Sequence, residues 1–254
     1  MPNETQDSRL DLSASSLASE RWALFLDIDG TLIDIAPGPD DVVVPVTLAS
    51  DLARVREHLG GAVAVISGRA IESIDRMLAP LRLAAAGQHG AQMRYAPDDP
   101  VLAAAAIDLS TLRRRLAPVT AVQGVEIEDK GMSLAIHYRK ADTHPGKLRD
   151  WIVQSLGDLG SDLEIMRGRR VIEIKPRGIS KATAVSAFMS RAPFLGRRPI
   201  FIGDDKTDED GFRAATAAGG LAIQVGPRQS ALATRWMENP SAVRRWLAEL
   251  SRAG

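Results

Sequence analysis

One segment, residues 22–32 with the sequence WALFLDIDGTL, constrains the fold more than any other part of this chain. Its apolar residues lead directly into the pentapeptide DIDGT, so Asp27 and Asp29 appear where a buried strand ends. In open α/β sheets, ligands bind beyond the carboxyl ends of the strands. Alternation along a strand places both aspartates on one side, and Gly30 allows a turn that offers backbone N–H groups to an anion. Two carboxylates this close require a cation or a proton, unless the pentapeptide is only an Asp- and Gly-rich turn.

The composition excludes several kinds of site. Lysine plus arginine and aspartate plus glutamate each number 32 among 254 residues, so the formal net charge is +0, and we expect neither a nucleic-acid nor a membrane partner. The absence of cysteine excludes disulfides, thiolate zinc sites and a cysteine nucleophile, and it fits the cytoplasm, the expected location. Residues 1–20 lack the basic start and apolar core of a secretory signal and are interpreted as a flexible tail. We expect the protein to be a monomer.

Hydrophobic periodicity predicts that strands and helices alternate on both sides of a central segment. The expected strands are 22–26, 62–66, 83–86, 199–203 and 221–225, and the expected helices are 46–59, one ending near 78, one starting near 181, 209–218 and one starting near 240. This alternation predicts an α/β fold with a doubly wound, mostly parallel, Rossmann-like sheet.

The central segment has a different order of elements, αββαββ. Its expected helices are 101–116 and 145–159, and its expected strands are 122–128, 132–138, 163–166 and 170–174. This order predicts an α+β domain with an antiparallel sheet covered by two helices, bounded by proline-containing junctions. We therefore divide the chain into a tail at 1–20, a core at 21–96 and 177–254, and an inserted domain at 97–176.

A second acidic cluster follows the strand predicted at 199–203. Residues 204–210 read DDKTDED, and carboxylates this dense at a buried edge repel one another unless a hard cation neutralises them. Oxygen ligands of this kind suit Mg2+. Alternatively, Asp208, Glu209 and Asp210 are the acidic first turn of a helix, whose macrodipole favours negative charge. Asp204, which follows the strand directly, is the stronger metal-ligand candidate.

Ser67 and Lys181 are candidates for binding a phosphate group. Ser67 offers a hydroxyl donor where a helix starts, and Lys181 is a cation at the start of the helix that follows the central segment. Each residue also has a simpler interpretation, because Ser67 could be a helix N-cap and Lys181 a solvated surface residue.

Four motifs resemble, in order and spacing, those of the haloacid dehalogenase superfamily of aspartyl phosphatases. These motifs are the DIDGT pentapeptide, Ser67-Gly68-Arg69, Lys181 and Gly203-Asp204-Asp205. The segment inserted between the second and third motifs is similar to the larger, C2-type cap of that superfamily. More narrowly, GDDKTDEDGF, GQHGA, EDKGMSLAIHYR and RRVIEIKP resemble segments of the trehalose-6-phosphate phosphatase family within it.

This resemblance implies a role for each core motif. Asp27 would be the nucleophile that forms an aspartyl-phosphate, and Asp29 would protonate the leaving sugar oxygen and then deprotonate the hydrolytic water. The residues implied to hold Mg2+ are Asp27, Asp204, the backbone carbonyl of Asp29 and, in support, Asp208. The residues implied to hold the phosphate are Ser67, Gly68 and Lys181. The implied reaction is hydrolysis of trehalose 6-phosphate.

The resemblance also implies a sugar site on the inserted domain. Glu128, Lys130 and Glu173 match residues that contact trehalose hydroxyls in that family, and Arg139 is a further candidate. Charged side chains are suitable partners for vicinal hydroxyls. Alternatively, these four residues form cross-strand charge pairs on a solvated sheet face.

Two other interpretations of function remain open. The protein could be a phosphatase for sucrose 6-phosphate or a glycosyl-phosphoglycerate, with the same chemistry. It could also be a non-catalytic phosphate receiver or sugar-phosphate sensor, although receivers lack a second carboxylate two positions after the phosphate acceptor. The histidines His58, His89 and His137 lack metal-ligand spacing and are expected to make local hydrogen bonds or to lie on the surface.

Overall fold

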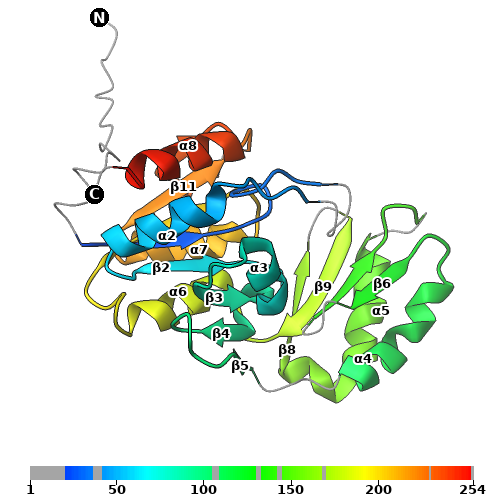
Figure 1. Ribbon diagram of the computed structural model, residues 1–254. Helices are drawn as coiled ribbons and strands as arrows, with labels where there is room; N and C mark the ends of the chain where they lie inside the picture. Colours follow the sequence, from blue (N-terminus) through cyan, green and yellow to red (C-terminus); the bar gives the residue numbers. More distant parts are fainter. Residues whose placement is uncertain are drawn as a thin grey trace, which may run out of the picture.

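The structure is a computed structural model that describes residues 21–36, 42–104, 109–129, 133–141, 145–167, 170–228 and 230–252. The predicted tail at 1–20 and the candidate Lys130 lie outside these ranges. Within them, the strands form one eight-stranded and one four-stranded sheet, which lie next to each other (Figure 1).

The eight-stranded sheet is mostly parallel. Its strands are β1 (Trp22–Leu26), β2 (Val63–Ile66), β3 (Ala84–Gly87), β4 (Gln92–Arg94), β5 (Leu102–Ala103), β10 (Arg198–Gly203), β11 (Leu221–Val225) and β12 (Arg235–Met237). Their order is β12-β11-β10-β1-β2-β3-β4-β5, and only β4 and β5, at one edge, pair antiparallel to their neighbours. The prediction of a mostly parallel α/β sheet is confirmed.

Helices cover both faces of this sheet, which is why its central strands are apolar on both sides. Along β1, Leu24 and Leu26 pack against α2 (Leu48–His58), α3 (Ile71–Leu78) and α8 (Pro240–Leu250). The alternate residue Phe25 packs on the other face against α6 (Lys181–Met189) and α7 (Asp208–Ala217). Figure 1 shows the sheet between these two helix layers. The central strands are thus buried between two helix layers.

The four-stranded sheet is antiparallel and lies, in the chain, between β5 and α6. Its strands are β6 (Glu126–Asp129), β7 (Leu134–His137), β8 (Leu163–Arg167) and β9 (Val171–Pro176), in the order β6-β7-β9-β8. Two helices, α4 (Leu109–Leu116) and α5 (Pro145–Leu156), pack on one face through a buried cluster that includes Ile136, Ile174 and Ile152. In Figure 1 these helices lie on the side of the sheet away from the eight-stranded sheet. The face of the four-stranded sheet that these helices leave uncovered is turned toward the larger sheet.

Two local predictions in this region are wrong. Leu102 and Ala103 do not belong to a helix from 101 to 116 but form β5, which pairs with the edge of β4. Here backbone pairing at an open sheet edge outweighs helix propensity. The strand expected at 122–128 begins only at Glu126, because Gly124 turns the chain with a φ of +82°. A Cβ atom there would lie 2.4 Å from the Lys140 carbonyl oxygen, so this position requires glycine.

Candidate active site

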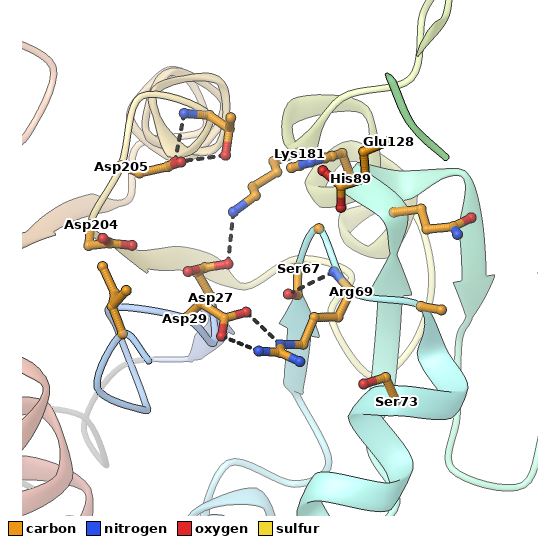
Figure 2. Close-up of a pocket in the computed structure, with 15 residues that line it drawn as sticks. Asp27, Asp29, Ser67, Arg69, Ser73, His89, Glu128, Lys181, Asp204 and Asp205 are labelled. Carbon is orange, nitrogen blue, oxygen red and sulfur yellow. Dashed lines mark hydrogen bonds and ion pairs between the residues drawn. The ribbon is translucent and has the colours of Figure 1, made fainter. Parts of the chain in front are cut away.

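Three neighbouring parallel strands end at the same edge of the sheet and bring the predicted motifs together. Asp27 follows β1, Ser67 follows β2 and Asp204 follows β10, and β10, β1 and β2 are adjacent. Figure 2 shows these residues around a pocket of 530 Å3. The lining residues used below are Asp27, Asp29, Ser67, Gly68, Arg69, His89, Glu128, Lys181 and Asp204.

Lys181 is buried between two carboxylates at the base of this pocket. Its Nζ donates to Asp27 Oδ1 at 2.8 Å and to Asp208 Oδ1 at 2.6 Å, and its side chain is only 3% exposed. The preceding residue, Ser180, caps α6 by a reciprocal pair of hydrogen bonds with Thr183. This cap fixes Lys181 as the first residue of the helix. The interpretation of Lys181 as a solvated surface residue is therefore wrong.

Asp208 is buried beneath the end of β10. Its Oδ2 accepts hydrogen bonds from the backbone N–H groups of Asp204 and Asp205, both at 3.0 Å. A Cβ atom at Gly203 would lie 2.2 Å from Asp208 Cγ, so glycine at the strand end is what allows this approach. Asp208 does begin α7, as the alternative interpretation expected, but it also forms a buried ion pair with Lys181, so the helix start is not its only role.

Glu209 and Asp210, in contrast, form ion pairs at the first turn of α7. Glu209 pairs with Arg228, and Asp210 Oδ1 accepts from Arg213 Nη1 at 2.9 Å. Asp210 and Arg213 lie three residues apart on one helix face. Of the three acidic residues in the first turn of α7, Asp208 is thus buried against Lys181, whereas Glu209 and Asp210 pair with arginines.

Three carboxylates form a group that fits a hard divalent cation. Oxygen atoms of Asp27, Asp204 and Asp208 all lie within 4.8 Å of one another. Gly30, with a φ of +80°, makes room for this group, since a Cβ atom there would lie 2.2 Å from Asp204 Oδ2. A donor set made only of oxygen atoms suits Mg2+. The side chain of Asp29 is not part of this group and bonds Arg69 instead.

The same group carries more negative charge than one lysine neutralises. Burial raises the pKa of Asp27 well above its ordinary value; Lys181 opposes this shift and Asp208 adds to it. Burial and the charge of Asp208 raise the pKa of Asp204 to about 7. Burial alone would lower the pKa of Lys181, but Asp208 and Asp27 raise it well above its ordinary value. A bound cation would offset the repulsion among these carboxylates, which adds to the effect of burial.

The metal-free protein is expected to lose stability as the pH rises through this range. In the unfolded chain Asp204 loses its proton near pH 3.8, whereas the folded protein keeps it until about pH 7. Between these values the folded state binds more protons, so raising the pH favours unfolding. Thermal unfolding in EDTA should give a lower Tm at about pH 8 than at about pH 5.5, and Mg2+ should raise Tm more at the higher pH. Equal Mg2+ effects at both values would contradict this explanation.

Asp29 forms a two-point ion pair with Arg69. Arg69 Nε donates to Asp29 Oδ2 at 2.7 Å, and Nη2 donates to Oδ1 at 2.6 Å (Figure 2). Both planar groups are thereby fixed in orientation. Sequence reasoning did not assign Arg69 a role, although its place directly after Ser67 and Gly68 was a signal that it lies in the site.

Ser67 does not cap the helix that follows it. The N-cap of α3 is Ala70, and Ser67 Oγ instead accepts from the backbone N–H of Arg69 at 3.2 Å. Ser67 is 1% exposed and lines the pocket together with Gly68. The N-cap interpretation is wrong, and Ser67 lines the same pocket as Asp27 and Asp29.

The open face of the four-stranded sheet brings two of the four sugar-site candidates to the site. Glu128 and Glu173 are cross-strand neighbours of the small residue Ala135, one on each side. Glu128 lines the pocket of 530 Å3 described above, called the main pocket from here on, and its Oε2 bonds His137 Nε2 at 2.8 Å. Glu173 accepts from Ser133 Oγ at 2.7 Å and lines a small neighbouring cavity, which also includes Lys181.

The other two candidates are not placed at the site. Arg139 is exposed in the turn after β7 and lines neither of these two cavities. Lys130 lies outside the described residues.

Fold and site together define a class of enzyme. A parallel sheet with strand-end aspartates and a buried lysine is the architecture that the sequence motifs implied, and solved phosphatases of the haloacid dehalogenase superfamily share this fold. Within that class, the chain belongs to the trehalose-phosphatase family, whose model matches residues 25–236. The family resemblance noted in the sequence is thereby confirmed.

Individual relatives agree with this placement. The chain is 44% identical over 218 residues to a probable trehalose-phosphate phosphatase of Sinorhizobium fredii, with 85% of this chain and 82% of the relative covered. It is 39% identical over 217 residues to trehalose-6-phosphate phosphatase of Escherichia coli, with 82% and 79% covered. The structure of Aspergillus fumigatus trehalose-6-phosphate phosphatase has the same fold, with a TM-score of 0.75 at 23% identity, covering 96% of this chain and 97% of that one.

Proposed function

We propose that this protein is a Mg2+-dependent phosphomonoesterase that hydrolyses trehalose 6-phosphate to trehalose and phosphate. The observation that carries the proposal is the buried group of Asp27, Lys181 and Asp208 beneath a pocket that Glu128 also lines. Membership of the trehalose-phosphatase family and the names of the bacterial relatives support the choice of substrate.

The chemistry divides between the two aspartates of the first motif. In the first step, a carboxylate oxygen of Asp27 bonds to phosphorus as the bond from phosphorus to the sugar oxygen breaks, and Asp29 gives a proton to that oxygen. In the second step, Asp29 takes a proton from water, whose oxygen displaces Asp27 and releases phosphate. Ser67, Gly68 and Lys181 hold the remaining phosphate oxygens, because phosphoryl transfer depends mainly on positioning and charge neutralisation.

Asp27, Asp204 and the carbonyl of Asp29 would hold the Mg2+ ion, with Asp208 in support. When bound, the ion supplies positive charge that offsets the phosphate and the carboxylate group. The pKa of Asp204 is raised to about 7 first by burial and then by repulsion from Asp208 and Asp205, and such a cation would relieve the repulsion.

Arg69 bonds both carboxylate oxygens of Asp29 and so fixes the position of this group. Replacing Arg69 with methionine should lower kcat by roughly 10- to 100-fold, since a misplaced catalytic carboxylate slows both steps. Replacement with lysine keeps the charge but loses the two-point geometry, so it should restore activity only in part. Steady-state rates with trehalose 6-phosphate measure both effects, and Arg76→Met, an exposed arginine on α3, is the matched control. Wild-type rates in Arg69→Met would show that Asp29 needs no such partner.

Residues 97–176 form a C2-type cap, and residues 21–96 and 177–254 form the catalytic core. Glu128 and Glu173 occupy one row of the cap sheet on either side of Ala135, whose small side chain leaves space between them. Two carboxylates spaced in this way accept hydrogen bonds from hydroxyls on one sugar face. Lys130, which lies outside the described residues, and Arg139, which lines neither cavity, stay candidates from the sequence.

A panel of phosphate esters tests the function. Initial rates of phosphate release are measured with Mg2+ for trehalose 6-phosphate, sucrose 6-phosphate, a glycosyl-phosphoglycerate and p-nitrophenyl phosphate. Trehalose 6-phosphate should give the highest kcat/KM, and EDTA should stop its hydrolysis. Faster release from another sugar phosphate would reassign the substrate, whereas tight binding without release would favour a sensor.

The protein acts as a monomer in the cytoplasm, with neither a nucleic-acid nor a membrane partner. The absence of cysteine supports a cytoplasmic location, and the formal net charge of +0 argues against a nucleic-acid or membrane partner. No helix in the described ranges has the length and apolar character needed to cross a bilayer. Light scattering after size exclusion measures the oligomeric state.

A further inference from the structure

The GQHGA motif contains two consecutive residues in an unfavourable backbone conformation. Gln88 and His89 follow β3 with φ values of +49° and +59°, although neither is glycine. The left-handed region is costly for such residues and persists only where the surrounding structure enforces it. Strain of this kind is concentrated at functional sites, so the turn is a candidate for a role in the reaction.

Hydrogen bonds hold this turn against the phosphate-binding loop. The backbone N–H of Gln88 donates to the Arg69 carbonyl, and that of His89 donates to the Ser67 carbonyl, both at 2.9 Å. On the other side, a Cβ atom at Gly90 would lie 3.0 Å from the Ser180 carbonyl oxygen, next to the start of α6. The turn therefore lies between the loop that carries Ser67 and the N-terminus of α6, which carries Lys181.

The imidazole of His89 lies directly against Gly68. A Cβ atom at Gly68 would lie 3.0 Å from His89 Nε2, so the glycine leaves space for the ring. His89 lines the main pocket, which includes Glu128, and also the small cavity that includes Glu173. Figure 2 shows the residue beside Lys181 and Glu128, at the boundary between the phosphate end and the cap sheet.

We infer that His89 is a sugar-binding residue of the core, which the strained turn holds at the junction between the bound phosphate and the sugar attached to it. An imidazole nitrogen can donate a hydrogen bond to a sugar hydroxyl or accept one from it. From its position over Gly68, the ring can reach the sugar unit that carries the phosphate. This inference rests on the proposed function. It gives the core a part in sugar selection beside Glu128 and Glu173 of the cap.

Glycine and asparagine variants separate the side chain from the backbone. His89→Gly removes the imidazole, but glycine adopts a positive φ freely, so the turn and the loop should keep their shape. We expect its kcat/KM for trehalose 6-phosphate to fall roughly tenfold or more, mainly through KM. For p-nitrophenyl phosphate, which has no sugar, the change should be less than about threefold. His89→Asn, which tolerates the left-handed region and keeps a polar side chain, should recover part of the loss.

A control variant, together with the panel of phosphate esters measured on the wild type, distinguishes failure of this inference from failure of the proposed function. Arg170, a further non-glycine residue with a positive φ of +64°, lies on the cap, and Arg170→Gly should leave both activities unchanged. Equal losses on both substrates in His89→Gly and His89→Asn would assign the residue a purely structural role and overturn the inference. An unchanged sugar-phosphate rate in His89→Gly would also overturn it while leaving the proposed function intact. If another sugar phosphate is the best substrate, the comparison uses that one; if none is hydrolysed, both proposals fail.

Discussion

Replacing Asp27 with asparagine should reduce phosphate release from trehalose 6-phosphate by roughly 10⁴-fold or more, while the protein stays folded. The amide has nearly the same shape but cannot attack phosphorus as a carboxylate does. Stability should not fall in EDTA, because burial and Asp208 already disfavour the charged form of Asp27. Lys181 keeps its second partner, Asp208, at 2.6 Å. The increase in Tm that Mg2+ causes should become smaller, since one of the three carboxylates is lost.

Acid quenching during turnover of phosphate-labelled substrate adds an independent measurement. The wild type should retain label on the protein and Asp27→Asn should not. Asp98→Asn, which changes an exposed aspartate, is the matched control for loss of one charge. Labelled protein or normal turnover in Asp27→Asn would remove Asp27 from the role of nucleophile.

Lys181→Met is the other variant with a large expected effect, because it changes both activity and stability. The carboxylates of Asp27 and Asp208 would lose their buried cation, and breaking such an arrangement costs about 3–5 kcal/mol. A phosphate oxygen would also lose a charged donor, which typically lowers kcat by about 10²- to 10³-fold. The free energy of unfolding and the steady-state rate measure the two effects separately.

The stability loss in Lys181→Met should depend on pH and on metal. It should be largest in EDTA at high pH, where the carboxylates are ionised, and smaller with Mg2+, which supplies positive charge in place of the ammonium group. Lys147→Met, an exposed lysine on α5, controls for loss of a lysine elsewhere. A Lys181→Met protein as stable as the wild type in EDTA at high pH would mean that the buried ion pairs contribute little.

The strand ends of the core could be predicted from local pattern alone. An apolar run followed by polar residues marks where a buried strand stops, and this rule located Asp27, Ser67 and Asp204. Since parallel strands present their carboxyl ends at one edge, the three residues were expected to meet, and they do. Helix and strand alternation likewise predicted the mostly parallel sheet.

The local sequence pattern predicted secondary structure less well where contacts with other segments of the chain decide which element forms. β5 forms because β4 offers an open edge, whereas the local sequence of residues 101–116, with its run of alanines, favours a helix. The start of β6 depends on Gly124, whose backbone passes close to Lys140. Each case is decided by a contact with a distant part of the chain, which periodicity does not report.

The sequence alone therefore determined which residue types stand at the ends of the core strands, because burial gives each short segment a recognisable hydrophobic pattern. Only the tertiary structure decided how these residues pair. Lys181 bonds Asp27 across 154 positions of the chain, and Arg69 bonds Asp29 across 40. His89 is held over Gly68 by a backbone conformation that its own preferences disfavour. Such pairings arise from packing one element against another, so they exist only once the sheet has assembled.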